Sequence, residues 1–205
     1  MKYIFCAGAP GSKWSSLIKN IYYSPSVDRS DYSEARTYWH DAPGTMQLMH
    51  LGAYFDPGME FDLPVDLSIL SKDELERRFD EPFSGEGVRI IKSHIFAHNI
   101  DFLRHTWPDC PIILADRSDD AALGWWVKCG HFNITYPSYD KYYKDLRTMA
   151  GIIADQNRDI RTAWLKYNGL VVDNNHQLAS RLGIQQAPAE YQQDYATADL
   201  GVKVI

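Results

Sequence analysis

The fold is decided by Tyr3-Ile4-Phe5-Cys6-Ala7 and by the stretch that follows it directly, Gly8-Ala9-Pro10-Gly11-Ser12-Lys13. The first stretch is a short apolar run ending at glycine and proline, which is typical of a buried parallel strand. Apolar residues then recur at helical spacing, which predicts a helix over 14–23. A strand, a tight turn and a helix in this order point backbone N–H groups and a helix dipole at one place. The opening segment therefore predicts an anion-binding loop.

Strands and helices alternate along the rest of the chain. Apolar runs predict further strands at 88–92, 111–115 and 170–172. Helices are expected at 71–79, 97–105, 119–128, 177–182, and from Ser138 to 167 with a break near Gly151. The alternation predicts a single α/β domain over 1–205, a three-layer P-loop-type parallel sheet with helices on both faces. Ligands of such sheets bind at the carboxyl ends of the strands.

The stretch 40–64 differs from the rest because it mixes proline and glycine with methionine and aromatic residues. It is too long and too apolar for a simple linker. We expect a lid or acceptor-binding insertion, which would suit an acceptor with apolar or sugar character. The other interpretation is a loop packed on the core for structural reasons.

Composition limits the class of protein. The chain has a net charge of −6 with 45% hydrophobic residues, which is typical of a globular protein and argues against a broad nucleic-acid surface. No apolar run approaches the roughly 20 residues that span a bilayer, and a signal peptide over 1–10 is disfavoured by its short apolar part. Three cysteines without CxxC spacing favour a reducing cytoplasm over disulfides or structural zinc. We expect a cytoplasmic protein with a small-molecule partner, and the sequence indicates no oligomeric state.

The opening loop matches the Walker A motif G-x-x-x-x-G-K-[ST] only in part. With Lys13 at the lysine position, Ala7 and Ser12 replace the glycines and Trp14 replaces the magnesium-binding hydroxyl. A glycine-rich turn without a ligand is therefore one interpretation. The features that still suit an anion are small residues, one lysine and three hydroxyls: Lys13, Ser12, Ser15 and Ser16.

Two later segments change the interpretation of this loop: Ile90-Ile91-Lys92-Ser93-His94 and Ile112-Ile113-Leu114-Ala115-Asp116-Arg117. Together with Ala9-Pro10-Gly11-Ser12-Lys13-Trp14-Ser15-Ser16, they resemble the sulfotransferase family, which uses 3′-phosphoadenosine 5′-phosphosulfate as donor. The family's loop is of the type P-K-S-G-T-T-W, so Gly11 stands where the family has lysine and Lys13 where it has glycine. Leu182-Gly183-Ile184 is similar to the family's last helix end, and the resemblance spans about residues 1–184.

The resemblance implies transfer of a sulfuryl group to a hydroxyl or amine of a small acceptor, leaving 3′-phosphoadenosine 5′-phosphate. It implies His94 as catalytic base, Lys13 and Lys92 as charges that stabilise the transfer, and Arg117 with Ser118 at the 3′-phosphate. No metal is expected, because a sulfuryl group carries less negative charge than a phosphoryl group. The residues expected to bind the donor's phosphosulfate are Pro10, Gly11, Ser12, Lys13, Trp14, Ser15 and Ser16.

Other functions remain open from the sequence. A P-loop nucleotide or small-molecule kinase would use Asp116 and Ser15 on magnesium. A non-catalytic binding protein could keep the same fold after losing the donor.

Individual residues also have simpler interpretations. His94 could be a hydrogen-bonded core histidine, or could share a metal with His98 at helical spacing. Arg117 could pair on the surface with Asp119 or Asp120.

Overall fold

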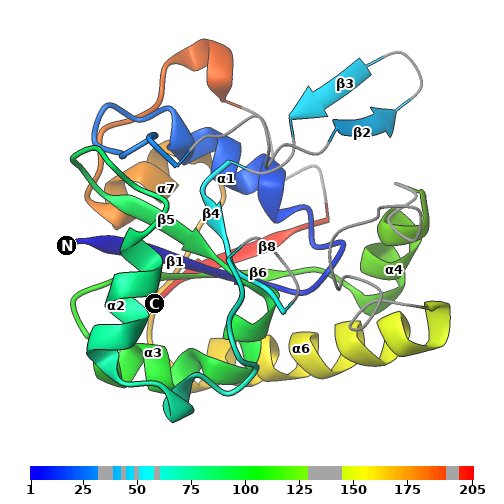
Figure 1. Cartoon of the computed structure of the whole chain (residues 1–205). Helices are drawn as coiled ribbons and strands as arrows, with labels where there is room; N and C mark the ends of the chain where they lie inside the picture. The colour runs from blue at the N-terminus through cyan, green and yellow to red at the C-terminus, as the bar shows by residue number, and fades with distance from the viewer. Residues whose placement is uncertain (32–38, 43–44, 49–50, 58–60, 129–144, 193–198) are drawn as a thin grey trace.

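The computed structural model describes residues 1–31, 39–42, 45–48, 51–57, 61–128, 145–192 and 199–205. Its main sheet has six strands in the order β4-β5-β1-β6-β8-β7 (Figure 1). The strands are β1 (Tyr3–Gly8), β4 (Ala53–Tyr54), β5 (Arg89–Lys92), β6 (Ile112–Asp116), β7 (Leu170–Val171) and β8 (Gly201–Val204). β4, β5, β1 and β6 are parallel, whereas β8 runs antiparallel to both β6 and β7. The chain therefore has an α/β fold with a mixed, mostly parallel sheet.

The antiparallel strand β8 corrects the expected all-parallel sheet. β8 inserts between β6 and β7, so the strand expected at 170–172 becomes the sheet edge. Leu170 and Val171 are each 49% exposed there, which differs from the buried strand that their apolar character predicts. A four-residue strand with a central lysine carries too little apolar pattern to be recognised in the sequence.

Helices cover both faces of the sheet, as the alternation predicted. They are α1 (Trp14–Tyr22), α2 (Lys72–Asp80), α3 (Ile100–Thr106), α4 (Asp119–Lys128), α6 (Leu146–Lys166) and α7 (Asn175–Leu182). Successive β1 side chains point to opposite faces: Ile4 and Cys6 join the apolar cluster that contains α1 and α7, whereas Phe5 and Ala7 join the cluster that contains α2 and α3. Figure 1 shows these two helix pairs on opposite sides of the sheet.

Two helix expectations need correction. α6 continues without a break through Gly151, and Asp145 caps it by accepting from Thr148 N at 2.8 Å; the expected start at Ser138 lies outside the described residues. The helix expected at 97–105 is divided into two parts: the 3₁₀ helix η3 (His94–Asn99) comes first, and α3 begins only at Ile100. The helix expected at 71–79 is confirmed as α2, and Ser71 caps it, since its Oγ accepts from Glu74 N.

The expected lid at 40–64 is only partly separate from the body. β2 (Trp39–Ala42) and β3 (Thr45–Leu48) form an antiparallel pair. By contrast, β4 extends the main sheet beside β5, and the neighbouring Leu51 and Phe55 are buried. The part of the insertion around β4 is therefore core structure.

The described cysteines, Cys6 and Cys110, are both buried free thiols. Burial raises the pKa of the Cys6 thiol to about 12, so it stays protonated. In the part of the chain that the structure describes, no helix combines the length and apolar character needed to cross a membrane.

Candidate functional site

The strand order puts a topological switch point at the carboxyl ends of β1 and β5. These strands are neighbours, and the chain leaves them toward opposite faces: β1 continues into α1, and β5 continues into η3. A ligand crevice is expected at such a switch point in an open α/β sheet. The opening loop and the Lys92-Ser93-His94 segment therefore border the crevice expected at this switch point.

The loop between β1 and α1 is held by left-handed backbone and by close contact with α4. Gly11 has φ 77°, and Lys13, which precedes the first turn of α1, has φ 61°. A Cβ at Gly11 would lie 2.0 Å from the carbonyl oxygen of Ala122. The Lys13 side chain makes no capping hydrogen bond to α1. The loop thus presents a helix N-terminus to the crevice without a side-chain cap from Lys13.

The side chains of the loop point in different directions. Ser12 is 1% exposed, and its Oγ has no hydrogen-bond partner among the described residues. The Nζ of Lys13 lies 4.6 Å from the centre of the Trp125 ring on α4. The Nζ of Lys128 lies 5.6 Å from the same ring centre. Lys13 therefore packs against α4 in this structure.

His94 is enclosed by the ends of three strands. Its ring is 4% exposed, and Nδ1 donates to the carbonyl of Gly8 at the end of β1. The Trp14 indole stacks on the ring, with centroids 4.0 Å apart and an interplanar angle of 11°. Nε2 lies 3.9 Å from Oδ2 of Asp56, two residues beyond β4. His94 is thus a hydrogen-bonded, buried histidine as the simpler interpretation held, but one placed in the crevice.

Lys92 is fully buried next to the same rings. Its Nζ lies 5.9 Å from the Trp14 ring centre and 5.8 Å from that of Tyr54, within the range of cation–π attraction. The predicted residues Lys92, His94 and Trp14 are therefore brought together.

The buried ring gives the stability of the protein a defined pH dependence. Burial lowers the pKa of His94, against the opposing effects of the Asp56 charge and the Gly8 hydrogen bond, and the Lys92 charge lowers it further. Below about pH 6.5 an unfolded histidine takes a proton that folded His94 resists. We therefore expect His94 to be neutral at pH 7. The protein should lose folding stability as the pH falls below about 6.5, the pKa of an unfolded histidine.

Urea unfolding of the wild type and of His94→Asn, measured between about pH 8 and pH 5, checks this expectation. The wild type should lose more stability on acidification than the variant. His98→Asn is the control, because His98 lies in a part-exposed ion pair with Asp159. Equal pH slopes for wild type and His94→Asn would contradict the assignment.

Arg117 lies beneath the loop and not on the surface. Its Nη1 donates to Gly11 O at 3.0 Å, and its own carbonyl accepts from Asn157 and Arg161 on α6. Arg161 pairs with Asp119, one of the two surface partners considered for Arg117. Ser118 is exposed and accepts from Ala121 N, as a helix cap does. The structure therefore brings Arg117 to the loop and leaves Ser118 at the start of α4.

Sequence reasoning missed Asp56 and Tyr54, which it had assigned to the expected lid. The Asp56 carboxylate is fully buried and accepts from Ser93 Oγ, the backbone N–H of His94 and the Tyr54 hydroxyl. A signal existed in the short apolar run Ala53-Tyr54-Phe55 that ends at Asp56-Pro57, since an acidic residue after a short strand is placed at the carboxyl edge.

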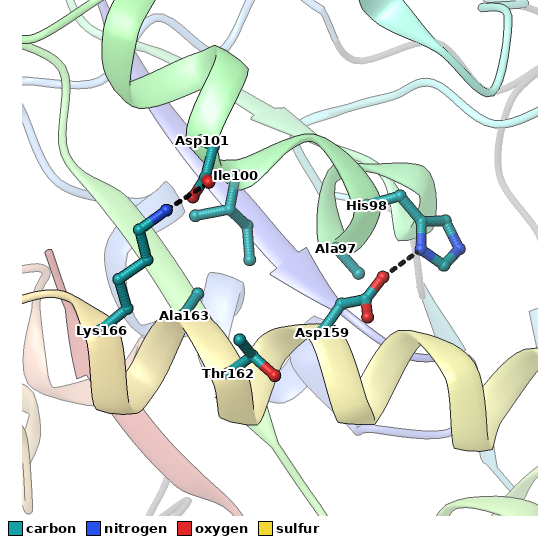
Figure 2. A pocket seen from close by; sticks show the side chains of 8 residues that line it. All are labelled: Ala97, His98, Ile100, Asp101, Asp159, Thr162, Ala163 and Lys166. Atoms are coloured by element: carbon teal, nitrogen blue, oxygen red, sulfur yellow. Dashed lines mark hydrogen bonds and ion pairs between the residues drawn. The ribbon is translucent and has the colours of Figure 1, made fainter.

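A second cavity of about 200 Å³ lies between η3, α3 and α6 (Figure 2). His98 Nδ1 is 2.7 Å from Asp159 Oδ2 at one end, and Lys166 pairs with Asp101 at the other. The charged groups at both ends of this cavity thus already have partners within the protein. Among the described residues no three metal-ligating side chains converge, and His94 and His98 take different partners.

No protein-family model, curated protein or solved structure matches this chain. The fold and the site together define an α/β protein with a candidate anion-binding loop beside a buried lysine and histidine.

Proposed function

We propose that the chain is a sulfotransferase-like enzyme that moves a sulfuryl group from 3′-phosphoadenosine 5′-phosphosulfate to a hydroxyl or amine of a small acceptor. The observation that carries the proposal is the meeting of the opening loop with Lys92 and His94 at the β1–β5 crevice. The opening loop, the Lys92-Ser93-His94 segment and Arg117, which resemble segments of one family, follow the neighbouring parallel strands β1, β5 and β6.

The residues of the loop suit an anionic donor. Ser12 Oγ is a buried hydroxyl without a partner among the described residues, and such groups call for a ligand or water. The start of α1 supplies backbone N–H groups and the positive end of a helix dipole. Arg117 adds a guanidinium next to Gly11. The loop, Lys13 and Arg117 would hold the donor's phosphate groups.

The donor supplies the activated sulfuryl group, and the chain supplies proton transfer and charge. His94 Nε2 would take the proton from the acceptor hydroxyl or amine, because Nδ1 is already committed to Gly8 O. Lys92 would offset negative charge that develops during transfer. Since the imidazole is 4% exposed beneath Trp14, an acceptor reaches Nε2 only when the side chains around the ring move.

That burial also favours a second candidate function. A non-catalytic binding protein could keep this fold after losing the donor, with His94 and Lys92 serving only the core. The P-loop kinase is less favoured, because Arg161 Nε already donates to Asp116 Oδ1 at 3.0 Å.

Thermal unfolding with nucleotides separates these functions. At 100 times its dissociation constant, 3′-phosphoadenosine 5′-phosphate without metal should stabilise the protein by about 2.7 kcal/mol. For a chain of this size, the melting temperature should then rise by roughly 5–10 °C. Stabilisation by ATP that requires magnesium would instead indicate a kinase, and no response to either nucleotide would contradict a donor site.

A matched pair of lysines sharpens the nucleotide test. Lys13 and Lys128 both lie on the Trp125 ring, but only Lys13 belongs to the loop. We expect Lys13→Ala to remove most of the stabilisation by 3′-phosphoadenosine 5′-phosphate and Lys128→Ala to keep it. Transfer of labelled sulfate to a panel of sugars, phenols and amines then distinguishes the enzyme from the binding protein.

A further inference from the structure

The Asp56 carboxylate, two residues beyond β4, accepts three hydrogen bonds. Ser93 Oγ and the backbone N–H of His94 donate to Oδ1 at 2.7 and 2.8 Å, and the Tyr54 hydroxyl donates to Oδ2 at 2.7 Å. The residue is fully buried. Hydrogen bonds to the ionised form stabilise a buried carboxylate, and these bonds tie it to the turn that starts η3.

The same carboxylate faces the reactive side of the His94 ring. A carbonyl oxygen only accepts, so the hydrogen bond to Gly8 O places a proton on Nδ1 and leaves Nε2 as the basic nitrogen. Asp56 Oδ2 lies 3.9 Å from Nε2, too far for a direct hydrogen bond but close enough for strong charge interaction.

We infer that Asp56 is a positioning residue for His94, which fixes the imidazole through the β5–η3 turn and stabilises the imidazolium formed during the reaction. This inference rests on the proposed function. The acceptor's proton would pass to Nε2 while its oxygen or nitrogen bonds to sulfur. The sulfur–oxygen bond to the donor would break, and its electron pair would leave on 3′-phosphoadenosine 5′-phosphate.

Burial lowers the His94 pKa most, and two opposing charges act on the ring beside it. Asp56 from β4 favours the imidazolium, whereas Lys92 from β5 opposes it. The Tyr54 ring lies edge-on to His94. Its hydroxyl donates a hydrogen bond to Asp56 Oδ2, which partly screens the Asp56 charge. Trp14 from α1 covers the ring without a charge of its own. Asp56 is therefore the one acidic group among those described around His94.

Histidine NMR titration of the free protein tests the coupling without an activity assay, with the His94 signal assigned by its loss in His94→Asn. Asp56→Asn keeps the side-chain shape and removes the charge, so the His94 pKa should move down. Tyr54→Phe removes one hydrogen bond from Asp56 Oδ2 and so leaves more negative charge on that oxygen. The His94 pKa should therefore move up. The opposite signs keep the test valid if Asp56→Asn fails to fold. Asp159→Asn is the matched control, because Asp159 is the carboxylate partner of His98, and it should leave the His94 signal unchanged.

The transfer assay supplies the second measurement. In Asp56→Asn, kcat should fall about tenfold or more with KM little changed, and the acidic limb of the pH–rate profile should move down with the His94 pKa. The inference would be overturned if neither variant shifted the His94 pKa. It would also be overturned if Asp56→Asn kept transfer activity with an unchanged pH–rate profile. If the titration shifts as expected but no transfer is found with any acceptor, the proposed function fails and the Asp56–His94 coupling stands.

Discussion

Gly11→Ala is expected to destabilise the protein by about 3 kcal/mol or more, with a fall in melting temperature of about 10 °C. Two costs combine at this position. A side chain at φ 77° is strained, and its Cβ would stand 2.0 Å from the Ala122 carbonyl oxygen on α4. Because backbone cannot yield as a flexible side chain does, the loop and α4 must separate. Thermal and urea unfolding measure the loss.

Gly11 accepts a hydrogen bond from Arg117, which we propose holds the donor's phosphate groups together with the loop. Gly11→Ala should therefore also weaken nucleotide binding. Moving Gly11 breaks the hydrogen bond from Arg117 Nη1 to Gly11 O. Gly124→Ala and Gly151→Ala are matched controls, because both lie in helices and a Cβ there meets nothing within 4 Å. Each control should stabilise the protein by about 0.5–1 kcal/mol. A Gly11→Ala protein as stable as the wild type would show that the loop does not pack on α4 as described.

The opening segment could be predicted from the sequence because local patterns determine it. The apolar run of β1, the glycines of the turn and the helical spacing of α1 each agree with the structure. The same holds for the strand that ends at Lys92 and for the helix after Ser118, where a short apolar run or periodic residues were enough.

The rest of the site depends on contacts between distant segments. β4 has two residues, and only its pairing with β5 across the sheet brings Asp56 to His94. β8 likewise depends on its register with β6 and not on its own pattern. Arg117 was expected at the right edge, but its partner Gly11 lies 106 positions earlier in the chain. No local pattern specifies such partners. The sequence therefore predicted the strands and helices of the site but not the contacts between these distant segments.

The largest expected effect on activity comes from His94 and Lys92. If His94 is the base, His94→Asn should lower turnover by about 10²–10⁴-fold. Asparagine can still donate from Nδ2 to Gly8 O, so the loss would reflect the missing proton acceptor and not a broken contact. Lys92→Ala should lower turnover by about 10²–10³-fold, as the loss of one charge at the transferring group does.

The matched control for His94 lies one helical turn away. His98→Asn changes the same residue type on the same 3₁₀ helix, but its partner is Asp159 at the part-exposed second cavity (Figure 2). It should keep full transfer, with a stability change below about 1 kcal/mol. Full turnover in both His94→Asn and Lys92→Ala would remove both residues from the chemistry. Since each is buried beneath Trp14, they would then belong to the core, and the transfer would depend on another base.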